Sequence, residues 1–328
     1  MCTALSIQTK NKEVFLGRTL DFSFELDPSI YVTPRDYKWL NKINNEEIIN
    51  KYKFIAIGEE TPKIIFTDGV NESGLGVAAL YFQGEAHYQK ELSGNKVPVG
   101  SIDFIAYLLG NYSSTSDVLL SINKLEIIGI EDEVTNTIAP LHWFVVDKTG
   151  TGVVIEPTKK GLEVTYNPIN VLANAPDFKW HLTNLRNYLN LSPKQKSEAI
   201  WEGVMLKPFG QGSGTYSLPG DYTSPSRFVR AAYLKSFTQL EDESIVNTCF
   251  NILKSVSIPK GVVITDRNTS DYTQYTAFIN LNEAAYYFNT YNNGDIIKAS
   301  INDADSLEIK SLGKLKQKPN FPLLKNYK

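Results

Sequence analysis

Short runs of β-branched and aromatic residues recur along the chain, and turn-forming residues separate them. They predict strands over residues 3–9, 13–20, 52–57, 63–67, 75–82, 143–147, 152–156, 162–166, 262–265, 272–280, 284–291 and 296–300. Turn signals at Thr149-Gly150 and Asn293-Gly294 join neighbouring runs into hairpins. We therefore expect mostly antiparallel sheet.

Apolar residues at helical spacing predict four helices, over residues 101–110, 115–124, 225–237 and 243–256. The third opens with "SPSR", which places Pro225 in its first turn. Because strands and helices come in blocks rather than in alternation, the pattern predicts an α+β fold.

No internal repeat or low-complexity linker divides the chain, so we expect a single domain over residues 1–328. The stretches "LSPKQKSEAI" and "GQGSGTYSLPGDYTSP" are typical of long surface segments. The lysine-rich end that begins at Lys310 is typical of a solvated or loosely docked terminus.

Composition and charge narrow the class of protein. A net charge of -3 with mixed signs supplies no field for nucleic acid or an anionic membrane, so neither is an expected partner. The apolar runs are far shorter than a membrane span, and the N-terminus has no export signal. The two cysteines, Cys2 and Cys249, form no disulfide framework and no zinc spacing, which indicates the cytoplasm.

The first two predicted strands form a hairpin that gives Cys2 its neighbours. A two-residue loop at Asn11-Lys12 puts Cys2 opposite Asp21, and a shift of two residues puts it opposite Thr19. Arg18 and Asp21 point to opposite faces of an ideal strand, because they are three residues apart. We expect both to serve one site only if the strand ends or bulges between them.

Removal of Met1 would give Cys2 a thiol and a free α-amine on one residue. An α-amine has an ordinary pKa of about 7.7–8.0 and a thiol one of about 8.5, so proton transfer from sulfur to nitrogen costs little. Asp21 would orient the amine and Arg18 would stabilise the thiolate. The alternative is a small residue in an edge strand beside an ordinary surface ion pair.

Several ordered blocks resemble one protein family. "MCTALSIQT", "LGRTLDF" and "VTPRDY", followed by "FTDGVNESGLGVAALYFQGEAHY", "VLANAPDFKWHLTNLRNY" and "SPSRFVRAAYLK", resemble the choloylglycine hydrolase family of penicillin V acylases and bile salt hydrolases. The resemblance covers residues 1 to about 290. It implies an N-terminal-nucleophile amidase with a four-layer αββα sandwich of two antiparallel sheets, a mature chain starting at Cys2, and a homotetramer.

The resemblance also implies the site and its chemistry. By matching blocks, the catalytic residues are Cys2, Arg18, Asp21, Asn174 and Arg227. The Cys2 sulfur attacks an amide carbonyl, the Asn174 side chain and a backbone N–H near Tyr81 hold the oxyanion, and water hydrolyses the thioester. No cofactor or metal is implied. Ala173, where many members have Thr, removes a hydroxyl that could support Asn174.

Tyr81 bears on the substrate, because penicillin V acylases carry Tyr in this block and bile salt hydrolases carry Asn. We therefore predict hydrolysis of penicillin V, with conjugated bile salts as the alternative and N-acyl homoserine lactones as further plausible amides. A non-catalytic ligand-binding protein with this fold is the second alternative. Candidates for the substrate pocket, each equally typical of plain core, are Leu20, Phe22, Phe24, Phe66 and Leu141.

Other chemistry-bearing residues form no convincing pattern. His87, His142 and His181 are widely spaced, which argues against a metal site. Cys249 falls on the apolar stripe of a predicted helix and is expected in the core. "GQGSG" lacks the context of a phosphate-binding loop. The acidic run at 130–133 is expected to be a solvated turn, although loops at such positions can border a pocket.

Overall fold

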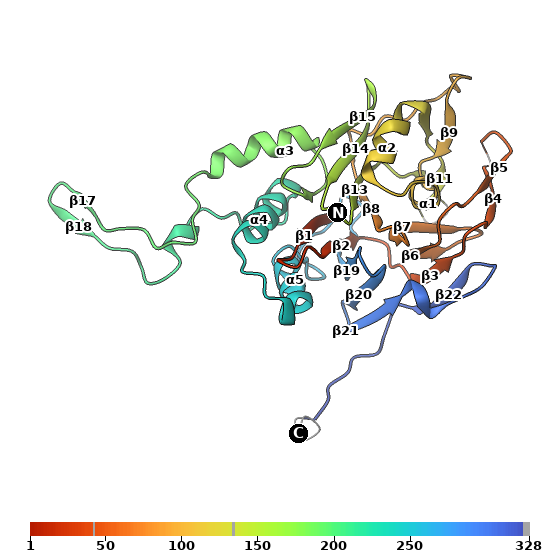
Figure 1. Cartoon of the computed structure of the whole chain (residues 1–328). Coiled ribbons are helices and arrows are strands. Elements are labelled where there is room, and N and C mark those ends of the chain that lie inside the picture. Colours follow the sequence, from red (N-terminus) through yellow and green to blue (C-terminus); the bar gives the residue numbers. More distant parts are fainter. Residues whose placement is uncertain (42, 133–134, 324–328) are drawn as a thin grey trace.

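Two large antiparallel sheets are stacked on each other in the computed structural model, which describes residues 1–41, 43–132 and 135–323 (Figure 1). The first sheet has the order β16-β1-β2-β19-β20-β21. Its strands are β16 (Val171–Leu172), β1 (Cys2–Gln8), β2 (Val14–Phe22), β19 (Tyr272–Asn280), β20 (Ala285–Thr290) and β21 (Asn293–Ser300).

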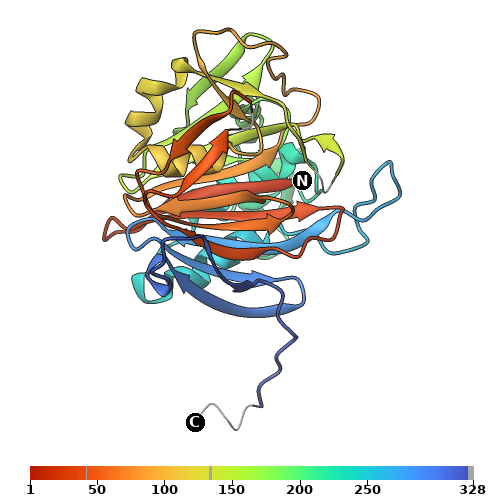
Figure 2. The same cartoon turned by 90° about the vertical axis from the view of Figure 1, so that its right-hand side faces the viewer.

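The second sheet has the order β15-β14-β13-β8-β7-β6-β3-β22. Its strands are β15 (Gly161–Tyr166), β14 (Gly152–Thr158), β13 (Leu141–Asp147), β8 (Leu75–Tyr81), β7 (Ile64–Asn71), β6 (Phe54–Glu60), β3 (Ser29–Thr33) and β22 (Lys310–Lys314). Strands from the two ends of the chain thus lie side by side, as Figure 2 shows.

Helices cover the outer faces of both sheets. The helices α4 (Ser224–Phe237) and α5 (Ile245–Lys254) pack on the first sheet, whereas α1 (Phe104–Asn111) and α2 (Thr115–Ser121) pack on the second. The result is a sandwich of four layers, which confirms the expected α+β fold. The short helix α3 (Phe178–Asn184) was not predicted.

Smaller elements lie at the margins of the two sheets. They are β4 (Lys38–Asn41), β5 (Glu46–Ile49), β9 (Val97–Gly100), β10 (Leu125–Ile128), β11 (Glu131–Asp132), β12 (Thr137–Ile138), β17 (Ala199–Trp201), β18 (Val204–Leu206) and five single 3-10 turns at 122–124, 185–188, 213–215, 242–244 and 301–303. The described part of the chain has no helix with the length and apolar character needed to cross a membrane.

Burial on both faces explains why apolar and polar residues do not alternate along the central strands. Eight of the nine residues of β2 are buried, because the second sheet covers one face and helices cover the other. Trp143 and Phe144, consecutive residues of β13, pack on opposite faces of the second sheet. The Trp143 ring lies 4.6 Å from Phe104 of α1, and Phe144 belongs to the cluster that includes the first sheet. Cys249 of α5 lies in that same cluster, as predicted.

Two local predictions are wrong. Residues 262–265 form only an isolated bridge, and Val262 and Ile264 are more than half exposed. The turn predicted at Asn293-Gly294 lies two residues earlier, because Thr290 pairs with Asn293. The lysine-rich end, expected to be solvated or loosely docked, begins as the largely exposed edge strand β22. Residues 324–328 of that end lie outside the described residues.

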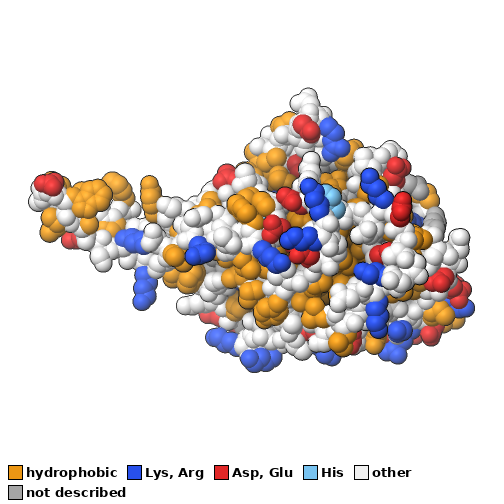
Figure 3. Space-filling model, turned by 90° about the horizontal axis from the view of Figure 1, so that it is seen from above, with side chains coloured by type: hydrophobic (Ala, Val, Ile, Leu, Met, Phe, Trp, Pro, Cys, Tyr) orange, Lys and Arg blue, Asp and Glu red, His pale blue; other side chains and the backbone are white. Residues whose placement is uncertain are grey.

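The hairpin β17-β18 projects away from the body of the molecule (Figure 1). Its exposed side chains are large and apolar, and Figure 3 shows them gathered on the projection. They include Ile200, Trp201, Val204 and Met205, which are 68, 71, 60 and 55% exposed. The expectation of long surface segments on either side of it is confirmed.

Candidate active site

The register of the first hairpin differs from both predicted registers. Cys2 lies opposite Leu20, and the Thr9 N–H donates to the Glu13 carbonyl at 2.8 Å. The loop therefore has three residues, and Lys12 ends it with a φ of 67°. A left-handed third residue is typical of three-residue hairpin loops and shifts the pairing by one residue.

Arg18 and Asp21 approach the end of β1 from opposite faces of the sheet. Arg18 lies between the two sheets and contacts the Cys2 side chain. Asp21 lies on the other face with Thr19, whose hydroxyl donates to it at 3.2 Å. The bulge of this region is in β19, between Thr273 and Tyr275, and not between Arg18 and Asp21. Both residues nevertheless line one cavity together with Cys2, which lies at the end of its strand.

The Arg18 guanidinium is fixed by several acceptors. Its Nη2 lies 2.9 Å from Cys2 Sγ, and its Nη1 donates to the Thr67 carbonyl at 2.9 Å and to Asp68 Oδ2 at 3.4 Å. Burial by itself would lower the pKa of Arg18, but the charges of Cys2, Tyr275 and Asp68 give a net rise. A permanent buried cation therefore faces the sulfur.

Asn174 and Arg227 surround the backbone of Cys2. Asn174 Oδ1 accepts the Cys2 N–H and Arg227 Nη2, each at 2.7 Å, and Arg227 Nη1 donates to the Cys2 carbonyl at 2.7 Å. Because Oδ1 accepts two donors, the orientation of the amide is determined. Asn174 Nδ2 points the other way and donates to the Tyr81 carbonyl at 2.8 Å. The preceding residue, Ala173, is buried in the core.

Asp21 balances the charge of Arg227 rather than contacting Cys2. Its Oδ2 lies 3.6 Å from Arg227 Nη1, and its Oδ1 accepts the Thr273 hydroxyl at 2.6 Å. Burial raises the pKa of Asp21, and the charge of Arg227 opposes that rise. Burial likewise lowers the pKa of Arg227, opposed chiefly by Asp21.

Met1 continues β1 alongside β2. Its amino group donates to the Asp21 carbonyl at 2.6 Å and pairs with Asp271 Oδ2 at 3.1 Å. Asp271 was not identified from the sequence. It belongs to none of the motifs discussed above. Its sequence position, 270 residues from Met1, gave no sign that the two would meet.

A cavity opens beside Cys2 where two strands separate. Pairing of β7 with β8 ends at Asp68 and Ala78, and the unpaired ends line a space of about 770 Å³ that includes its open mouth. The residues that line it are Cys2, Arg18, Leu20, Asp21, Phe22, Leu26, Glu59, Ile65, Phe66, Thr67, Ala79, Tyr81, Ile102, Asp132, Thr135, Ala139 and Leu141.

Four of the five predicted pocket residues line this cavity, namely Leu20, Phe22, Phe66 and Leu141. Phe24 does not line it. It lies beyond the end of β2, where its ring packs 5.6 Å from Phe22 and beneath the Arg267 guanidinium.

Tyr81 also lines the cavity, with its ring 6.2 Å from Phe22. Burial and, second, the charge of Asp132 raise the pKa of Tyr81, so its phenol stays neutral at neutral pH. Asp132 belongs to the acidic run expected to be a solvated turn. That expectation is wrong for Asp132, which is buried, while residue 133 of the run lies outside the described residues.

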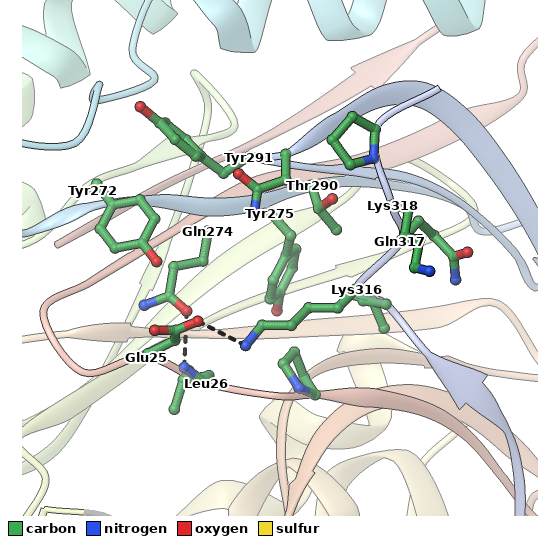
Figure 4. Close-up of a pocket in the computed structure, with 14 residues that line it drawn as sticks. Glu25, Leu26, Tyr272, Gln274, Tyr275, Thr290, Tyr291, Lys316, Gln317 and Lys318 are labelled. Atoms are coloured by element: carbon green, nitrogen blue, oxygen red, sulfur yellow. Dashed lines mark hydrogen bonds and ion pairs between the residues drawn. The ribbon is translucent and has the colours of Figure 1, made fainter. Parts of the chain in front are cut away.

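A second cavity lies behind Leu26, which lines both spaces (Figure 4). Gln274, the extra residue of the β19 bulge, accepts the Leu26 N–H at 3.0 Å and donates to the Phe22 carbonyl at 3.1 Å. The bulge thereby holds the segment after β2, which forms one wall of the cavity beside Cys2.

The histidines and the second cysteine take no part in the site's polar contacts to Cys2. His142 stacks on Phe82 and His181 stacks on Phe228, both buried. Burial raises the pKa of the Cys249 thiol to about 12. Within residues 1–41, 43–132 and 135–323 no group of three or more His, Cys, Asp or Glu side chains is placed to hold a metal ion.

Comparison with known proteins gives one consistent family. Residues 2–312 match the linear amide C-N hydrolases of the choloylglycine hydrolase family. The chain is 36% identical over 320 residues to the bile salt hydrolase/transferase of Clostridium perfringens (strain 13 / Type A), covering 95% of this chain and 96% of that protein.

A solved structure and a more distant relative add to this finding. The crystal structure of variant R18L of the conjugated bile acid hydrolase from Clostridium perfringens superimposes with a TM-score of 0.89 at 34% identity, covering 98% of this chain and 100% of that one. The penicillin V acylase of Pectobacterium atrosepticum is 24% identical over 296 residues, covering 83% of this chain and 73% of that protein.

Proposed function

Because this chain belongs to the choloylglycine hydrolase family of linear amide C–N hydrolases, we propose that it hydrolyses the amide bond of glycine- and taurine-conjugated bile salts. The observation that carries the proposal is the position of Cys2, whose sulfur lies in a largely apolar cavity and 2.9 Å from Arg18. The higher identity to a bile salt hydrolase than to a penicillin V acylase favours this substrate over the one predicted from Tyr81.

The proposed nucleophile is the Cys2 thiolate of a chain from which Met1 has been removed. The Cys2 nitrogen, which now donates to Asn174 Oδ1, would become a primary amine that takes the thiol proton. Arg18 would stabilise the thiolate by charge. Arg227 would hold the Cys2 backbone, and Asp21 would keep Arg227 in place by balancing its charge.

Two groups support a proposed oxyanion hole. The Asn174 amide nitrogen carries two hydrogens, of which the Tyr81 carbonyl accepts one. The Phe82 N–H already donates to the Pro140 carbonyl at 2.7 Å. Since consecutive amides of a strand point to opposite edges, the Tyr81 N–H points toward the side where β7 has separated, and it is the proposed second donor.

Each step then follows from ordinary acyl-transfer chemistry. The thiolate attacks the amide carbonyl, and the α-amine returns its proton to the departing nitrogen. Water attacks the resulting thioester with the amine as base, which releases the carboxylic acid and restores the thiol. We propose that the chain, once Met1 has been removed, does this as one domain in a reducing compartment such as the cytoplasm, consistent with two free thiols.

Penicillin V is the second candidate substrate. Tyr81 and Phe22 present aromatic faces 6.2 Å apart in the cavity, which suits an aryl acyl group.

The test measures release of free amine from glycine- and taurine-conjugated bile salts, penicillin V and an N-acyl homoserine lactone. We expect kcat/KM to be highest for a conjugated bile salt, and intact mass to show a chain that starts at Cys2. Cys2→Ala should abolish turnover, since it removes the nucleophile. Cys249→Ala is the matched control and should retain activity, because Cys249 lies on the buried face of α5 in the hydrophobic core and away from the cavity.

Higher kcat/KM for penicillin V would replace the proposed substrate with the second candidate. Binding of a bile salt without release of amine would instead indicate the non-catalytic member of the fold. Turnover by the Cys2→Ala variant would refute the mechanism itself.

A further inference from the structure

A fully buried carboxylate lies behind Arg18, on the side away from the sulfur. Asp68 Oδ2 accepts the Tyr275 hydroxyl at 2.6 Å and the Thr67 hydroxyl at 3.2 Å, and Asp68 Oδ1 accepts the Tyr286 hydroxyl at 2.7 Å. Arg18 Nη1 is the cationic group that contacts it, at 3.4 Å. Nothing in the sequence singled out Asp68 or either tyrosine.

The cluster joins the two sheets. Asp68 belongs to β7 of the second sheet, and Tyr275 and Tyr286 belong to β19 and β20 of the first. Burial and then the charge of Asp68 raise the pKa of both tyrosines well above the ordinary value, so both hydroxyls remain donors to the carboxylate. The carboxylate is therefore held in place by hydroxyl groups rather than by its cation alone.

Arg18 lies between the Cys2 sulfur and the Asp68 carboxylate. Its Nη2 faces the sulfur and its Nη1 faces Asp68, so the negative charge of Asp68 offsets part of the positive charge that the sulfur experiences. A charge-assisted N–H to carboxylate bond usually measures about 2.7–2.9 Å. At 3.4 Å the contact between Arg18 and Asp68 is longer than this, and the carboxylate also accepts the hydroxyls of Tyr275 and Tyr286.

The charge on the sulfur changes during the reaction, whereas that on Asp68 does not. As a thiol or a thioester the sulfur offers Arg18 no charge, and a buried guanidinium without a counter-ion is strongly destabilising. We propose, resting on the thiolate mechanism above, that Asp68 held by Tyr275 and Tyr286 is a positioning residue that serves as the permanent counter-ion of Arg18 and limits how strongly Arg18 stabilises the Cys2 thiolate.

Two variants separate this role from simple packing, because they act in opposite directions. Asp68→Asn removes the competing negative charge while Thr67 still holds Arg18, so the Cys2 thiol ionises at lower pH. Tyr286→Phe removes one donor from Asp68, which concentrates charge on the carboxylate beside Arg18, so the thiol ionises at higher pH.

The measurement is the rate of alkylation of Cys2 by iodoacetamide as a function of pH, followed by mass spectrometry on the full chain. We expect the pH at which the alkylation rate is half of its maximum, the midpoint, to fall by about one pH unit in Asp68→Asn and to rise in Tyr286→Phe. Cys249 does not interfere, because its pKa is raised to about 12.

Asp147→Asn is the matched control. Asp147 is a buried carboxylate that accepts the hydroxyls of Thr115 and Thr149 and does not belong to the cluster, so its loss should leave the midpoint unchanged. An unchanged or higher midpoint in Asp68→Asn would overturn the proposal, and so would shifts of the same sign in both variants. If Asp68→Asn does not fold, Tyr286→Phe decides alone, and an unchanged midpoint there overturns the proposal.

Failure of this inference is distinct from failure of the proposed function. Alkylation requires no substrate, so the ionisation of Cys2 can be measured even if the protein does not hydrolyse bile salts. Conversely, full turnover of bile salts with no shift in either variant would overturn the role of Asp68 alone.

Discussion

Asn174 shows how one side chain organises the site at the scale of residues. Its Oδ1 accepts from both Cys2 and Arg227, and this determines the direction in which its Nδ2 points. Matching sequence blocks placed Asn174 in the site, yet its own context, a residue before Ala-Pro, is typical of a plain turn. The hydrogen bonds that define its role come from partners 53 and 172 positions away in the chain.

His181 makes a prediction about pH at the same scale. It lies behind Asn174, with its Nε2 2.8 Å from the Asn174 carbonyl, and burial lowers its pKa from 6.5 to about 4. Between these values the unfolded chain binds a proton that the folded chain does not. The histidine therefore destabilises the fold as pH falls from about 6.5 to about 4, by about 2 kcal/mol between pH 7 and pH 4.5.

Urea denaturation at pH 7 and at pH 4.5 measures this contribution. In His181→Gln, the loss of unfolding free energy between the two pH values should be smaller than in the parent chain by that amount. His87→Gln serves as the control, because His87 bonds to a surface loop carbonyl and not to the core. An equal loss in the His181 variant and the parent would contradict the prediction.

At the scale of elements, the β1-β2 hairpin decides which residues meet. Its third loop residue shifts the register by one, so Leu20 rather than Asp21 or Thr19 lies opposite Cys2. The end of β2 at Phe22 has a second consequence. Phe24 leaves the strand and packs outside the cavity, although it shares the strand parity of Leu20 and Phe22.

The contact of β2 with β19 predicts a destabilising substitution. A Cβ at Gly17 would overlap the ring of Phe278, which is fully buried and packs 5.5 Å from Phe250. Because this ring has no space to move into, Gly17→Ala should lower the free energy of unfolding by about 1–3 kcal/mol. Gly294→Ala, where a Cβ meets open space, should change it by less than about 0.5 kcal/mol in the same urea titration. Equal stability of the two variants would contradict this account.

At the scale of the whole molecule, the projecting hairpin β17-β18 favours association with another copy of the chain, and the family resemblance suggests a tetramer. A lone two-stranded hairpin is at best marginally stable in water, and exposed apolar patches mark interaction surfaces. The hairpin extends away from the body (Figure 1), and its large apolar side chains are gathered on this projection (Figure 3). We infer that another copy of the chain covers them.

Light scattering after size-exclusion chromatography tests this assembly. The parent chain should have the mass of a tetramer, and replacement of Ile200, Trp201, Val204 and Met205 by Ser should reduce it, because the apolar contact is lost. Replacement of Val262 and Ile264, which are 54 and 55% exposed, by Ser is the control and should leave the mass unchanged. A parent chain that runs as a monomer would refute the proposed assembly.

Local pattern determined much of the fold. Most predicted strands and all four predicted helices are present within a few residues of their expected bounds, because hydrophobic periodicity reflects burial directly. The strand predicted at 262–265 is absent because these residues form only an isolated bridge. A run of β-branched residues forms a strand only when it has a pairing partner.

The sequence by itself determined the family, and through that resemblance it gave the α+β sandwich and the four polar residues Arg18, Asp21, Asn174 and Arg227 expected around Cys2. Only the tertiary structure decided the hairpin register, the approach of Arg18 and Asp21 from opposite faces, and the presence of Asp68, Asp271 and Asp132 near the site. The physical reason is that motif and periodicity report on neighbours within a segment. The charges that act on the sulfur, in contrast, come from strands that meet only when two sheets stack.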